Sequence, residues 1–176
     1  AMFRFFQVNR DIFLRTLCLV AVTLFFTSAG ASQGEIILAV NTLLMQLFTL
    51  FSYVMDGFAY AGEALSGRYI GARNREAFTD TVRHLFGWGA VIAVLFTLVY
   101  ALGGNAFLGL LTDDKEVIAV ADTYFYWALA VPAVGIAAFI WDGIFIGATA
   151  TRGMLLSMAA AAVSFFILYY GLHPVL

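Results

Sequence analysis

Charged residues are scarce in this sequence: they make up only 11% of its 176 residues, while 63% of the residues are hydrophobic. A soluble domain is typically about 25% charged and about 45–50% apolar. A soluble fold of this length would lack the polar side chains needed to cover its surface, and the mean hydropathy of +0.94 agrees. The composition therefore predicts an integral membrane protein whose main partner is the lipid bilayer, and we expect no nucleic-acid partner.

Several chemical signatures are also absent. The single cysteine, Cys18, cannot form an internal disulfide. The sequence has no H-E-x-x-H, no paired Cys/His spacing, no P-loop, no G-x-S-x-G and no dinucleotide fingerprint. Two Asp-Gly pairs, at 56–57 and 142–143, lack the surrounding residues that an intramembrane aspartyl protease needs. We therefore expect a protein that is not an enzyme, with no metal site and no cofactor.

Long apolar runs predict the fold. A spanning helix needs about 20 mainly apolar residues, and transmembrane strands would instead alternate over roughly 10 residues. Continuous apolar runs predict an all-α, polytopic transmembrane bundle of about five helices in a single domain, 1–176. The expected helices cover about 11–31, 35–66, 84–107, 117–149 and 153–172.

The basic residues are distributed asymmetrically. With five spans, every arginine falls on one side of the membrane, and only Lys115 falls on the other. By the positive-inside rule this pattern places the N-terminus in the cytoplasm. One alternative stays open: residues 2–31 also resemble a cleavable signal peptide, whose removal would leave four spans in the same orientation. The arginines are Arg4, Arg10, Arg15, Arg68, Arg73, Arg75, Arg83 and Arg152.

Two acids lie deep in the predicted spans. Each belongs to an Asp-Gly pair that precedes the arginine at the end of its helix, Asp56 before Arg68 and Asp142 before Arg152. This spacing places both carboxylates ~15–18 Å from the arginines, near mid-membrane. Removal from water favours a neutral carboxyl, so Asp142 and Asp56 are candidates for proton or cation binding. Neighbouring hydroxyls could instead satisfy them, and Asp56-Gly could mark a helix break.

Polar residues of the second span share one face. At about 100° per residue, they fall within an arc of roughly 80°. Lipid cannot satisfy this polar stripe, so it should face a protein interior or a water-filled cavity. Glu63 could instead form an ion pair with Arg68. Recurrent glycines in the second to fourth spans predict close helix packing. The stripe consists of Asn41, Ser52, Glu63, Asp56 and Thr49, and Tyr53 extends it.

Together these motifs carry a family resemblance. The segments 56-DGFAYAGEALSGRYIGARNRE-76 and 139-FIWDGIFIGATATRGMLLSM-158, with 9-NRDIFLR-15, resemble the multidrug and toxic compound extrusion (MATE) family, in particular its DNA-damage-inducible subgroup. Such transporters have twelve helices in two six-helix lobes. The chain is similar to the C-terminal lobe, helices seven to eleven. The resemblance therefore implies a piece of a longer transporter whose N-terminal lobe is a missing partner.

The resemblance also implies a function. Members exchange H⁺ or Na⁺ for organic, often cationic, compounds, so a coupling cation and a small organic substrate are expected at a bacterial inner membrane. Asp142 matches an acid that binds the coupling cation in the Na⁺-dependent branch, and Tyr53 matches a tyrosine near that site. Thr27 departs from that branch, which has a glutamate there. The subgroup usually places its proton-coupling acids in the first lobe. A lipid-linked precursor flippase of the same superfamily, or a non-transporting membrane scaffold, are the alternatives.

Overall fold

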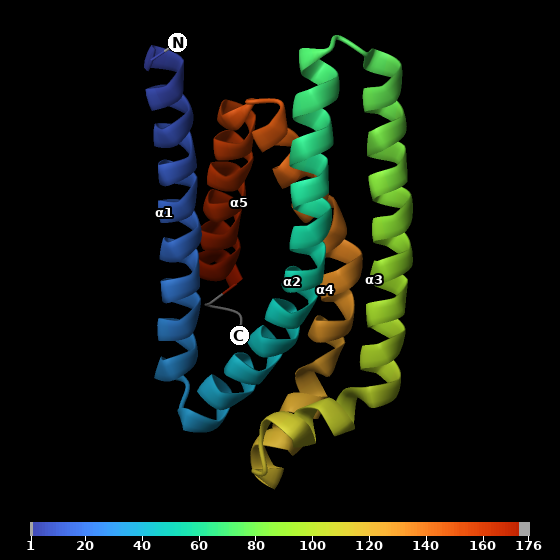
Figure 1. Ribbon diagram of the computed structural model, residues 1–176. Coiled ribbons are helices and arrows are strands. Elements are labelled where there is room, and N and C mark those ends of the chain that lie inside the picture. Colours follow the sequence, from blue (N-terminus) through green and yellow to red (C-terminus); the bar gives the residue numbers. More distant parts are fainter. Residues whose placement is uncertain (1, 173–176) are drawn as a thin grey trace. The chain divides into compact units, whose positions relative to one another are not determined.

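The computed structural model describes residues 2–172, apart from the side chains of residues 3, 4, 105 and 172. This part of the chain is all-α, as predicted, and each helix is long and apolar enough to cross a membrane. The protein is therefore a multi-pass membrane protein. The helices, shown in Figure 1, are α1 (Met2–Ser32), α2 (Glu35–Gly71), α3 (Arg75–Leu111), α4 (Lys115–Gly147) and α5 (Thr151–Leu172).

Several predicted helix ends were wrong. The link expected over 67–83 shrinks to residues 72–74, because α2 continues to Gly71 and α3 already begins at Arg75. The predictions followed the hydrophobic runs, but arginine and glutamate are good helix formers and extend a helix into the headgroup region. Arg73 has a φ of 54°, and the Asn74 side chain accepts a hydrogen bond from the Ala77 amide at 3.0 Å, which caps α3. α1 likewise begins earlier than predicted, and α4 ends earlier, at Gly147.

The chain divides into two compact units, and each is described by itself. One holds α1 and α5, and the other holds α2, α3 and α4. In the second unit, α2 and α3 run antiparallel on either side of their short turn, and α4 packs against both (Figure 1). The prediction of a single bundle stays a prediction.

The three-helix unit has two apolar clusters. The first joins the start of α2 to the end of α3 and the start of α4, around Tyr100, whose hydroxyl donates to the Leu47 carbonyl oxygen at 2.7 Å. The second lies farther along α2 and α4, around Phe51, whose ring is edge-on to Phe96 and Phe139. Edge-on aromatic packing of this kind holds the helices together, and the Tyr100 hydroxyl is satisfied by its bond to Leu47.

Pro132 lies buried within α4. Proline lacks an amide hydrogen, so the helix loses one backbone hydrogen bond there. The Thr97 hydroxyl of α3 donates to the nearby Leu129 carbonyl at 3.5 Å, which ties the weakened part of α4 to α3. Figure 1 shows that α4 changes direction along its length, as expected for a proline-containing helix.

The two-helix unit is held at two levels. Asp11 of α1 meets Thr151 of α5, and the Phe25 ring lies 5.0 Å from that of Phe166 and 4.9 Å from that of Tyr169. The residue numbers in both contacts increase in the same direction along the two helices, so α1 and α5 run parallel.

Candidate functional site

Glycines on α4 bring its backbone into contact with the backbone of α2. A Cβ atom added at Gly143 would overlap the carbonyl oxygen of Ala59, and one added at Gly147 would overlap that of Glu63. The spacing Gly-x-x-x-Gly places both glycines on one face of α4, the arrangement that lets two membrane helices approach backbone to backbone. The predicted role of glycine in close packing is confirmed at this crossing.

The facing side of α2 is also built from small residues. Gly62 is buried next to Ile140, and a Cβ atom at Gly67 would lie 3.3 Å from the carbonyl oxygen of Gly147. Ser66 lies between them, fully buried, and its hydroxyl has no hydrogen-bond partner within the described part of the chain. The sequence analysis did not single out Ser66, although its spacing from Gly62 repeats the small-residue pattern of α4.

The crossing fixes the relative level of the two candidate acids. Ala59 faces Gly143 and Glu63 faces Gly147, so α2 and α4 run parallel with a constant register. Asp142 directly precedes Gly143, and Asp56 lies one helical turn before Ala59. In this register the two acids differ in level by only about two residues, or ~3 Å along the helix axes. Both are half-buried.

The polar stripe lies beside the core of the unit and not within it. The buried face of α2 consists of apolar and small residues such as Leu47, Phe51 and Met55, while the stripe residues on the adjoining face are half-buried. Thr49 donates its hydroxyl hydrogen bond to the Met45 carbonyl at 2.8 Å, and Ser52 donates to the Thr49 carbonyl at 2.8 Å. These hydroxyls therefore satisfy their own helix and keep acceptor capacity for a ligand.

The stripe also includes Asn41, Tyr53 and Asp56. Asn41 sits against Gly30, near the turn that joins α1 and α2. Tyr53 is 71% exposed, so it is available to a neighbour outside the three-helix unit. Among the described residues, the Asp56 carboxylate has neither a hydrogen-bond nor an ion-pair partner.

The alternative ion pair between Glu63 and Arg68 is not found among the described residues. Two residues five positions apart on a helix point about 140° away from each other, so their side chains do not meet. The Arg68 guanidinium instead lies over the Tyr69 ring, 5.8 Å from its centroid. Glu63 contributes its backbone to the α2–α4 crossing, and its half-buried side chain stays in the polar stripe.

The sequence analysis missed one buried acid. Asp11 of α1 is only 1% exposed; its carboxylate accepts a hydrogen bond from the Thr151 hydroxyl at 3.1 Å and forms an ion pair with Arg10 at 3.1 Å. Asp11 thus fixes the start of α5 against α1. Nothing in the local sequence shows this, because Thr151 lies far along the chain.

Comparisons with known proteins agree with this architecture. The MatE family model matches residues 12–171. The chain is 42% identical over 162 residues to DNA damage-inducible protein F of Escherichia coli (strain K12), with 92% of the chain and 35% of the relative covered. It is 26% identical over 133 residues to Protein DETOXIFICATION 45, chloroplastic, of Arabidopsis thaliana, with 76% and 24% covered. No solved structure was found to match.

The coverage is as informative as the identity. The chain spans about a third or less of the length of these curated relatives, as expected for part of one lobe. The family model, in contrast, covers nearly the whole chain. The chain therefore belongs to the MatE family.

Proposed function

We propose that this chain is part of the second lobe of a cation-coupled antiporter that exports organic or cationic drugs across a bacterial inner membrane. Membership of the MatE family and the partial coverage of the relatives support this proposal. The N-terminal lobe would complete the substrate cavity, with the polar stripe of α2 lining this lobe's side of it.

The observation that carries the proposal is the pair of half-buried acids beside the α2–α4 crossing. Asp56 and Asp142 lie at nearly the same level on two parallel helices whose backbones touch. A carboxylate within a membrane is costly unless water, a cation or a proton neutralises it. Such a group takes up a cation or proton when water reaches it from one side and releases the ion to the other side after the lobes rearrange.

The coupling ion is a proton or a sodium ion. Asp142 would bind it, with Asp56 as a second acid nearby and Tyr53 as a hydroxyl next to the site. Thr27 holds its own hydroxyl hydrogen bond to the Thr23 carbonyl at 3.0 Å and offers no charge. A site that depended on a second carboxylate at that position would therefore not form in this chain.

The orientation follows from the charges. Arginines gather at the turn between α2 and α3, at Arg68, Arg73 and Arg75, whereas Lys115 begins α4 beside Asp113 and Asp114. The positive-inside rule then places the α2–α3 turn and the N-terminus in the cytoplasm.

A single substitution tests the proposal. Asp142→Asn keeps the size of the side chain but removes its charge and its ability to release a proton. In the complete protein that carries this chain, it should reduce drug resistance in cells to the level of cells without the transporter, at unchanged protein abundance. Asp122→Asn is the matched control, because Asp122 is an exposed acid on the same helix. Full resistance with Asp142→Asn would refute the assignment.

A further inference from the structure

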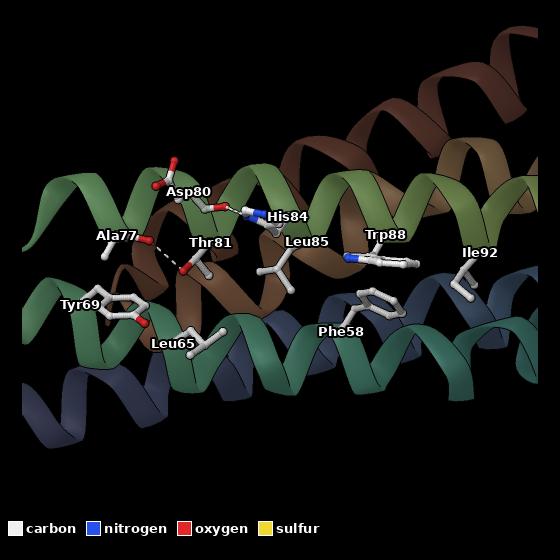
Figure 2. A pocket seen from close by; sticks show the side chains of 10 residues that line it. All are labelled: Phe58, Leu65, Tyr69, Ala77, Asp80, Thr81, His84, Leu85, Trp88 and Ile92. Atoms are coloured by element: carbon white, nitrogen blue, oxygen red, sulfur yellow. Dashed lines mark hydrogen bonds between the residues drawn. The ribbon is translucent and has the colours of Figure 1, made fainter.

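A groove runs between α2 and α3, and it belongs to neither the polar stripe nor the α2–α4 crossing. Its volume is about 520 Å³, within the range of roughly 300–1,000 Å³ typical of small-molecule sites. Figure 2 shows side chains from both helices lying between α2 and α3, with the Asp80 carboxylate turned away from α2. The lining residues on α2 are Phe58, Leu65 and Tyr69, and those on α3 include Asp80, Thr81, His84, Leu85, Trp88 and Ile92.

The two ends of this groove differ in chemistry. In Figure 2 the polar groups Asp80, Thr81 and His84 lie toward one end, and Phe58, Trp88 and Ile92 lie toward the other. The polar end is the one nearest the turn between α2 and α3. An occupant that matches both ends must itself be polar at one end and apolar along the rest.

Arginines flank the polar end from both helices. Arg68 of α2 lies over the ring of Tyr69, which lines the groove. Arg83 of α3 lines an adjoining hollow of about 270 Å³ that shares His84 and Trp88 with the groove. Arg73 lies in the loop between the two helices and Arg75 in the first turn of α3. The acids in the same region are Glu76 and Asp80. Arginines outnumber acids here, so the polar end attracts an anion.

The length of the groove matches one leaflet of a bilayer. From Tyr69 to Phe58 the groove follows eleven residues of α2, or ~16 Å, against about 15 Å for half the hydrocarbon core. Trp88, toward the apolar end of the groove, is 64% exposed. The body of the groove is lined by large aromatic and aliphatic side chains, a surface along which an acyl chain can lie.

We infer that the α2–α3 groove binds an anionic phospholipid, with its headgroup phosphate at Arg68 and Arg83 and one acyl chain lying along Phe58, Leu85 and Trp88. The arginines select the negative headgroup, and the apolar body of the groove holds the chain. This site is separate from the proposed coupling acids and does not depend on transport.

Quenching of Trp88 fluorescence by brominated lipids tests this site. The complete protein is reconstituted in phosphatidylcholine vesicles that contain a small fraction of lipid with brominated acyl chains, either phosphatidylglycerol or phosphatidylcholine. The fluorescence of Trp88 is obtained as the difference in fluorescence between the parent protein and its Trp88→Phe variant. We expect brominated phosphatidylglycerol to quench this fluorescence at a lower mole fraction than brominated phosphatidylcholine. Trp127, exposed on α4, should show no such preference when measured through Trp127→Phe.

Removing the arginine tests the headgroup contact. Arg83→Gln should reduce the phosphatidylglycerol preference at Trp88 about fivefold, as expected for the loss of one basic residue at a membrane surface. Arg152→Gln removes an exposed arginine outside the groove and should leave the preference unchanged. Equal quenching by both lipids would reduce the groove to ordinary lipid-facing surface. Absence of quenching would show that a protein helix fills it. Either result overturns the inference.

Discussion

Substitution of Gly143 by alanine should disrupt the α2–α4 crossing. The added Cβ atom would lie 2.7 Å from the carbonyl carbon and 2.8 Å from the Cα of Ala59, closer than the 3.0 Å that real Cβ atoms respect. These are backbone atoms of a helix, so no side-chain rotation relieves the overlap. The two helices would have to separate by on the order of 1 Å, because a packed interior has no free volume to absorb a methyl group.

The expected loss is about 1–3 kcal/mol of folding free energy, the usual range for an overpacked site. It includes the contacts of Gly147 with Glu63, which share the same interface and separate with it. A helix-interior glycine replaced by alanine otherwise gains about 1 kcal/mol from helix propensity. The measured change in folding free energy is therefore the loss from the backbone overlap minus the gain in helix propensity.

Gly57 offers a matched control. It follows Asp56 as Gly143 follows Asp142, but an added Cβ atom there meets nothing within 4 Å. Thermal unfolding of the complete protein in detergent, followed by helicity and by the folded fraction on size exclusion, should show a lower midpoint for Gly143→Ala. Gly57→Ala should leave the midpoint unchanged or raise it. If Gly143→Ala proves as stable as Gly57→Ala, the close crossing is wrong.

Two hydroxyl groups give further predictions. Thr151→Val leaves a buried oxygen of Asp11 without its donor, so it should lower stability by about 1–3 kcal/mol; Thr16→Val, at an exposed threonine that bonds only its own helix, should not change the unfolding midpoint. An equal midpoint for both variants would contradict the role of Asp11. Tyr100→Phe removes the bond to the Leu47 carbonyl and should lower stability by about 0.6 kcal/mol, and by no more than ~1.7. A larger loss, in the same unfolding assay, would mean that Tyr100 does more than donate this bond.

The sequence was a good guide to the spans because hydrocarbon thickness constrains them directly. It was a poor guide to helix ends near Arg68 and Arg83, since polar residues outside the bilayer continue a helix as readily as apolar ones. It also could not separate Gly57 from Gly143. The same Asp-Gly pair is open on α2 and tightly packed on α4, and only the partner helix decides which.

Partners distant in the chain explain the remaining misses. Asp11 is buried where it bonds Thr151 of α5, and Ser66 is buried on the face of α2 that carries Gly62, which no local pattern reveals. The angular count along α2 did indicate a polar stripe, and the structure places those residues at the edge of the apolar core.

The most direct test of the proposed function is ion movement driven by substrate. The complete protein is reconstituted in liposomes with a trapped pH indicator or a sodium indicator, and an organic cation is added on one side. The parent protein and Asp122→Asn should both move protons or sodium ions against the substrate, whereas Asp142→Asn should move neither ion nor substrate above the rate of empty liposomes. Coupled exchange that persists in Asp142→Asn would contradict the assignment of Asp142 as the coupling acid, and its persistence in the double variant with Asp56→Asn would contradict the assignment of both acids.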